Sequence, residues 1–143
     1  MRTSPALGLV VLLAACSSSG SSGTSAPKDP AVSSFTTGTC RDAAPGVLAL
    51  RKAARRLGRG PSVPTEVQQA VKDAQQQIMP MSTNPDPEGK RVLFLYSEAG
   101  FVRLQSIGNS YDPKVGATLL TAADTFVRSC TTPTSSTPTP APS

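Results

Sequence analysis

Apolar residues recur at intervals of three and four positions along most of the chain, the spacing that lines one face of an α-helix. Four stretches show this pattern, at 42–57, 64–79, 87–107 and 113–130, and each begins or ends beside proline or glycine. The connections between them are short and polar, which favours antiparallel neighbours. The pattern therefore predicts an all-α fold, a small up-down four-helix bundle.

The first two stretches are amphipathic, each with one narrow apolar face. In 42–57, Pro45 falls near the start, where a missing N–H costs little, and Gly58 ends the pattern. In 64–79, glutamines cover the polar face and Pro80 stops the helix. The apolar positions are Val47, Leu50, Ala54 and Leu57 in the first stretch, and Val67, Ala70, Val71, Ala74 and Ile78 in the second.

The third stretch begins with an Asp86-Pro87 pair, which is typical of a helix N-cap followed by proline at the first helical position. Further apolar residues lie all around this helix, so we expect it to be the most buried of the four. The positions at helical spacing are Val92, Leu95, Ala99, Val102 and Ser106.

The same stretch also allows a hairpin. Residues 91–96 and 101–104 are strand-like, and 97–100 could form the turn between them. We favour the helix because a lone two-stranded ribbon is marginal without partners. The alternative is an α+β fold with a hairpin at 90–107.

The fourth stretch repeats the start signal, with Asp112 as N-cap and Pro113 at the first helical position. Its apolar face ends at Cys130. In an up-down-up-down bundle, the end of the fourth helix lies beside the start of the first, where Cys40 stands. The apolar positions are Gly116, Leu119, Leu120, Ala123, Phe126, Val127 and Cys130.

A different apolar segment stands near the N-terminus. Residues 6–15 follow a single arginine and are too few to span a bilayer core, which needs about 20 residues in a helix. A signal peptide is the better interpretation. The segment closes with Leu13-Ala14-Ala15-Cys16, an aliphatic residue, two small residues and a cysteine.

These four residues resemble the lipobox of bacterial lipoprotein signal peptides at every position. The resemblance implies cleavage before Cys16 and a diacylglyceryl thioether on its sulfur, with chains such as palmitate. Two acyl chains are enough for stable anchoring. We therefore expect the protein on the outer face of the bacterial cytoplasmic membrane, bound to the membrane through the lipid on Cys16. The alternative is an ordinary secretory signal with an incidental cysteine.

The chain has three cysteines. If Cys16 carries lipid, Cys40 and Cys130 remain as an even pair in an oxidising compartment, which predicts a disulfide. A bridge around a loop of about 90 residues would stabilise the fold by roughly 4–5 kcal/mol. The alternatives are two reduced thiols or a metal pair, although two sulfurs without histidine make a poor zinc site.

Composition divides the chain into four parts. Residues 1–15 form the expected signal peptide, and 16–39 the lipidated cysteine with a flexible tether rich in serine and glycine. Residues 40–130 form the helical domain. The Thr/Pro-rich tail, 131–143, is expected to be disordered, with a composition that O-glycosylation would suit.

The net charge of +5 is concentrated in the first helix. An exported protein rarely meets nucleic acid, so we expect no nucleic-acid partner. The basic face is either a solvated helix surface or a contact for anionic lipid, wall polymer or an acidic envelope protein. Its residues are Arg51, Lys52, Arg55, Arg56 and Arg59.

The sequence offers little chemistry. It contains no histidine, the usual general base and the commonest metal ligand, and no phosphate-binding or calcium-binding loop motif. Asp86 and Glu88 are better explained by helix capping, and Glu98 by a surface position. We expect no metal, no cofactor and no enzymatic activity; a hydrolase using these carboxylates is the weak alternative.

From Cys40 to Cys130 the chain also resembles small actinobacterial lipoproteins of unassigned function. The shared features are a cysteine opening the first helix, an Ala/Arg-rich helix and a cysteine closing the last one. The resemblance implies an extracytoplasmic helical domain. We expect a non-catalytic binding or interaction module of the cell envelope. A purely structural spacer, or a small carrier of lipid or another apolar ligand in the bundle core, are alternatives.

Overall fold

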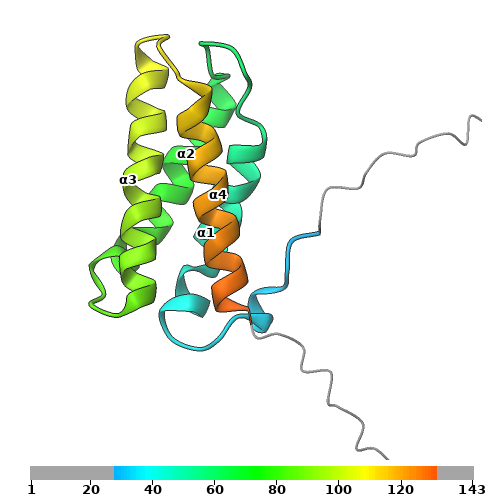
Figure 1. The fold of residues 1–143 in the computed structure, drawn as a ribbon, viewed down its shortest axis with the longest axis vertical. Helices are drawn as coiled ribbons and strands as arrows, with labels where there is room; N and C mark the ends of the chain where they lie inside the picture. The colour runs from blue at the N-terminus through cyan, green and yellow to red at the C-terminus, as the bar shows by residue number, and fades with distance from the viewer. Residues whose placement is uncertain (1–27, 132–143) are drawn as a thin grey trace, which may run out of the picture.

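Four helices run alternately up and down, and each packs against its neighbours in sequence, with the last closing onto the first (Figure 1). The computed structural model describes residues 28–131. The helices are α1 (Thr39–Arg55), α2 (Thr65–Ile78), α3 (Pro87–Ile107) and α4 (Pro113–Cys130). The prediction of an all-α four-helix bundle is confirmed. The hairpin alternative at 90–107 is wrong, because α3 is one continuous helix.

Local signals explain where α3 and α4 begin. The side chain of Asp86 accepts a hydrogen bond from the backbone N–H of Gly89, and that of Asp112 accepts one from Lys114. Both helices have the bounds that the sequence predicts. A 3-10 turn, η2 (Met79–Thr83), follows α2 and leads the chain towards α3.

The start of α1 differs from the prediction. The helix begins at Thr39, three residues early, so Pro45 lies in its second turn and not near its start. Gly38 precedes it with a φ of 82°, a left-handed conformation that favours glycine. The hydroxyl of Thr39 donates to Asp86 at 2.6 Å and accepts from the Asn84 amide at 2.8 Å. These bonds join the starts of α1 and α3.

The core lies between the four helices and consists mainly of aliphatic residues, as the low aromatic content requires. One close approach depends on glycine: a Cβ at Gly46 of α1 would lie 2.5 Å from a methyl carbon of Ile78 in α2. The largest fully buried helical side chains are Phe126, Leu50, Ile78, Leu95, Leu119, Val47, Val67, Val71, Val92 and Val102.

Cys40 and Cys130 form a disulfide between the start of α1 and the end of α4, as predicted. Their Cα atoms are 5.4 Å apart, and both residues are buried. The bridge lies at the end of the bundle where the described chain enters and leaves (Figure 1). It closes a loop with a sequence separation of 90 residues.

Part of the expected tether is wrong, because it is attached to the bundle. Most of residues 28–38 are exposed, but the side chain of Phe35 is 1% exposed and Asp29 forms an ion pair with Arg51 of α1. Phe35 also forms an isolated antiparallel bridge with Thr131, and the N–H of Thr36 donates to the Cys130 carbonyl at 2.8 Å. This segment contacts the bundle because Phe35, a large apolar side chain within a polar stretch, is buried there. The folded domain therefore includes Phe35 and Thr131, while residues 1–27, with Cys16, and 132–143 lie outside the described residues.

The expected burial of α3 is also wrong. Its inner face is buried as predicted, but a second apolar face points away from the bundle because α3 packs on α2 and α4 from one side only. Within residues 28–131, no helix combines the length and the hydropathy of a membrane-spanning segment. The exposed residues are Leu93, Phe94, Phe101, Leu104 and Ile107.

Candidate functional site

The predicted basic face is not a continuous contact surface. Arg51 is buried, with a side chain 11% exposed, and its guanidinium is shared by two carboxylates. Nη1 donates to Asp29 at 2.6 Å, and Nε donates to Asp124 of α4 at 2.5 Å. A cation held in this way is neutralised within the fold and cannot meet an external anion.

Two neighbouring arginines are also engaged. Arg55 donates to the same Asp29 oxygen at 3.3 Å, and Arg56 lies 3.6 Å from the carboxylate of Glu66. Lys52 and Arg59 are exposed and form no ion pair within residues 28–131. The five predicted contact residues therefore do not act together.

The three carboxylates that a hydrolase would use, those of Asp86, Glu88 and Glu98, do not form one site in the structure. Asp86 caps α3, and its hydrogen bonds from Thr39 and from the Gly89 N–H hold its pKa below the ordinary value of 3.8. Glu88 lies 3.7 Å from Arg91, one turn along the same helix. The side chain of Glu98 forms no hydrogen bond or ion pair with any other described residue. No cluster of potential metal ligands occurs between residues 28 and 131.

The outer face of α3 is the most unusual surface of the described chain. We name it the α3 stripe; its members are Leu93, Phe94, Phe101, Leu104 and Ile107. Their exposed fractions run from 48% for Phe94 to 78% for Ile107. Large side chains of this kind are normally scattered singly over a protein surface, and a contiguous group marks an interaction site.

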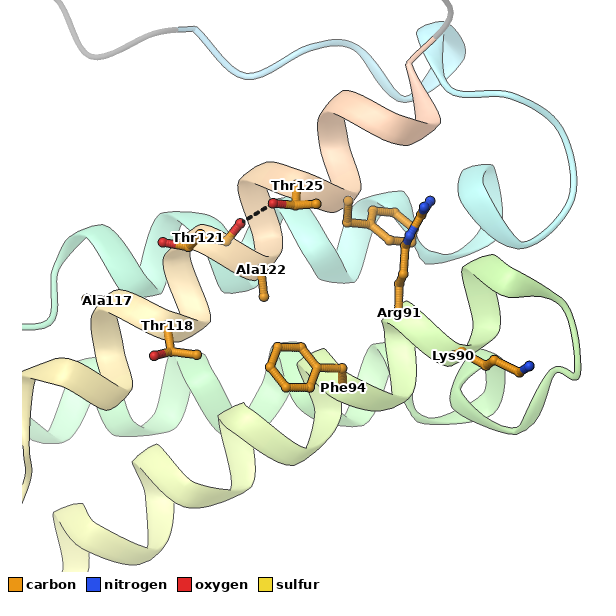
Figure 2. A pocket seen from close by; sticks show the side chains of 9 residues that line it. Lys90, Arg91, Phe94, Ala117, Thr118, Thr121, Ala122 and Thr125 are labelled. Atoms are coloured by element: carbon orange, nitrogen blue, oxygen red, sulfur yellow. Dashed lines mark hydrogen bonds between the residues drawn. The ribbon is translucent and has the colours of Figure 1, made fainter.

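A groove adjoins the α3 stripe where α3 meets α4. It has a volume of about 590 Å³, within the size range of small-molecule sites. Figure 2 shows the ring of Phe94 reaching from α3 towards a row of small side chains on α4. That row consists of Ala117, Thr118, Thr121, Ala122 and Thr125, and Phe126 completes the lining.

The groove is apolar along most of its length and basic at one end. Lys90 and Arg91 line that end. The threonine hydroxyls are largely occupied by their own helix, since Thr118 donates to the Lys114 carbonyl at 2.9 Å and Thr125 to the Thr121 carbonyl at 2.8 Å (Figure 2). The groove can therefore hold an apolar group, with room for one negative charge at its basic end.

The sequence contained a signal for this surface. The α3 residues at helical spacing form two rows, one centred on Leu95 and Ala99 and the other on Ser97 and Phe101. A helix that is apolar on all sides is usually buried, which is why the sequence predicts that α3 is the most buried of the four helices. Only the arrangement of the other helices shows that one row has no cover from residues 28–131.

In comparisons with protein-family models, with curated proteins and with solved structures, the chain matches none. The function must therefore be argued from the surface itself.

Proposed function

We propose that this protein is a lipid-anchored binding protein of the bacterial cell envelope, held on the outer face of the cytoplasmic membrane through Cys16. Its binding surface is the α3 stripe together with the adjoining groove. It works by non-covalent contact and has no enzymatic activity.

One observation carries the binding role. Five large apolar side chains share one face of α3, and three of them are more than half exposed. Exposed apolar surface is costly in water, and it favours aggregation unless a partner covers it. Outside α3, the large apolar side chains with more than a third of their surface exposed are only Val32 and Met79 among the described residues, so the cluster on α3 is not explained by the general packing of the bundle.

Two features support the envelope location. Leu13-Ala14-Ala15-Cys16 has the residue types of a lipobox, and it leaves an even pair of cysteines for the domain. The Cys40–Cys130 disulfide suits an oxidising compartment, since such bonds are rare in the reducing cytosol.

The anchor is tested in bacteria that produce the full chain with an alkyne-bearing fatty acid in the medium. We expect the label on the wild type and none on a Cys16→Ala variant, which should leave the membrane fraction. A control variant, Ser129→Ala, should keep both label and location. Equal labelling of the wild type and Cys16→Ala would contradict the anchor.

The binding surface is tested with a photo-reactive amino acid placed in the full chain in the living cell. At Phe94 it should give a cross-linked product of discrete mass. At Met79, which is equally exposed at 51% but lies outside the α3 stripe, it should give none. The absence of any product from Phe94, or the same products from both sites, would contradict the proposed surface.

A second function, transport of an anionic amphiphile, is favoured by the groove. Its apolar walls would cover part of an acyl chain, and Lys90 at its end, which forms no ion pair within the described residues, would meet a carboxylate or phosphate. Native mass spectrometry of protein purified from cells would show a bound lipid in the wild type and a reduced amount in Ala122→Phe, which fills the groove. Ligand-free protein in both would exclude this function.

A further inference from the structure

We propose that the α3 stripe pairs with the α3 stripe of a second copy of this chain, with the two helices antiparallel. The inference rests on the proposed binding role of this surface and names its partner. It follows from the order of large and small residues along α3, which makes the face complementary to itself.

The outer face of α3 has the spacing of a coiled-coil seam. Its central line alternates steps of four and three residues, and a repeat of this kind keeps one line of side chains facing a partner helix. The residues on this line are Lys90, Phe94, Ser97, Phe101 and Leu104. All five are exposed.

In an antiparallel pair, a large side chain of the seam packs against a small one of the second copy. When two copies of α3 are placed with their symmetry axis near Ala99, Phe101 lies opposite Ser97 of the second copy, and Phe94 lies opposite Leu104 of the second copy. The small side chain of Ser97 makes the hole that the ring of Phe101 needs. A two-fold interface requires each contact to occur twice, and these contacts do.

The flanks of the seam match in the same register. Leu93 lies beside Ile107 of the second copy. These two residues are the first and last members of the α3 stripe, so the pairing covers both of its ends. Gly100 lies on the same flank near the two-fold axis, and it has no side chain that would hold the two helices apart. On the other flank, the row of small α4 residues leaves room for the edge of a second bundle.

The charges favour antiparallel over parallel pairing. Lys90 continues the seam and forms no ion pair within the described chain. Parallel helices would place Lys90 against Lys90 of the second copy, which is repulsive. Antiparallel helices place it beside Gly108, at the carboxyl end of the second α3, where the helix dipole attracts a cation.

The exposed area is large enough. Two of the five members are aromatic, with about 150–250 Å² each, and the three aliphatic members are somewhat smaller but up to 78% exposed. Together they offer on the order of 500 Å² per copy, and two copies about 1,000 Å². That value is at the low end for a specific interface. We therefore expect a reversible dimer with a dissociation constant on the order of micromolar.

A membrane surface fits this face less well. Helices that lie in a lipid interface carry rows of lysine and arginine beside their apolar face. Beside the α3 stripe, basic residues lie only near its two ends. Lys90 and Arg91 lie at one end, and Lys72 and Arg103 line a hollow with Ile107 at the other. The charged residue near the centre of the stripe is the acid Glu98.

Sedimentation velocity of the mature chain, 16–143 with Cys16→Ser, tests the proposal. We expect a concentration-dependent dimer. Phe101→Glu should raise the dissociation constant by about a hundredfold, since the change occurs twice in each dimer. Met79→Glu, at a residue of equal exposure outside the stripe, should leave the constant unchanged. Circular dichroism on both variants confirms that they remain folded.

The outcomes separate the two proposals. A chain that stays monomeric well above micromolar concentrations, or a dimer that Phe101→Glu leaves intact, overturns pairing through α3. If such a monomer binds vesicles of phosphatidylglycerol and phosphatidylcholine, and loses that binding in Phe101→Glu, the surface is a membrane contact and not a dimer interface. The binding role then stands and the second copy does not.

Discussion

The Nη1 atom of Arg51 lies 2.6 Å from Oδ1 of Asp29, a residue that precedes it by 22 positions. The contact joins α1 to the segment before the bundle, and the Nε atom of the same arginine joins α1 to Asp124 of α4. One buried guanidinium thus connects three parts of the chain.

Removing this guanidinium should destabilise the fold. Arg51→Ala leaves Asp124 without its partner and Asp29 with Arg55 alone. It is expected to lower the free energy of unfolding by about 2 kcal/mol, less than for a fully buried pair because the carboxylates are about one third exposed. Lys52→Ala, one position along the same helix, should change it by less than about 0.5 kcal/mol. Urea unfolding measures both, and equal effects would contradict the structural role of Arg51.

Phe35 should behave as a core residue although it lies before the first bundle helix. Phe35→Ala is expected to lower the free energy of unfolding by about 3 kcal/mol, because the ring is fully buried. Val32→Ala, three residues earlier and 38% exposed, serves as the control and should cost less than about 1 kcal/mol. A stability unchanged by Phe35→Ala would mean that this segment does not pack on the bundle in solution.

Loss of the disulfide should be the most costly change at the end of the bundle. A double variant, Cys40→Ala with Cys130→Ala, is expected to lose roughly 4 kcal/mol relative to the oxidised protein, mainly because its unfolded chain is less restricted. Chemical unfolding measures the loss. The intact mass of wild-type protein should also rise by two hydrogens on reduction, and a constant mass would contradict the bond.

Acid should weaken the contact between the starts of α1 and α3. Since folding lowers the pKa of Asp86 below 3.8, its ionised form stabilises the protein above that pH, and the contribution is lost as the pH falls through the lower folded pKa. Asp86→Asn should therefore be less stable than the wild type at neutral pH, with a difference that shrinks in acid. Unfolding curves at several pH values test this.

Glu98→Gln is the matched control for the acid prediction, because the Glu98 side chain forms no hydrogen bond or ion pair within residues 28–131. It should keep the wild-type response to acid. A constant difference between Asp86→Asn and the wild type at all pH values would show that the carboxylate charge of Asp86 is not what matters.

The helices could be predicted where the signals are local. Asp86-Pro87 and Asp112-Pro113 place the starts of α3 and α4, because a capping side chain and a proline act within one turn. The start of α1 was missed because Thr39 is held by Asp86, 47 positions away. Helical periodicity contains no information on such a contact.

The exposed apolar face of α3, the proposed binding surface, could be only half predicted. The sequence shows that α3 is apolar on two sides, but it does not show which side the other helices cover. Similarly, the sequence shows the arginines of α1 as a basic row. It does not show that Asp124 of α4, which is 73 residues away, accepts a hydrogen bond from Arg51. In both cases the local pattern is correct, and the misassignment arises from tertiary neighbours.

Cross-linking through Ser97 tests antiparallel pairing most directly. In the mature chain with Cys16→Ser, Ser97→Cys places the two thiols about 6 Å apart along the helix axis, whereas Ser110→Cys, beyond the end of α3, places them about 30 Å apart. With a short bis-maleimide, the account predicts a covalent dimer for Ser97→Cys and none for Ser110→Cys. No dimer from Ser97→Cys, or equally efficient cross-linking through Ser110→Cys, would contradict it.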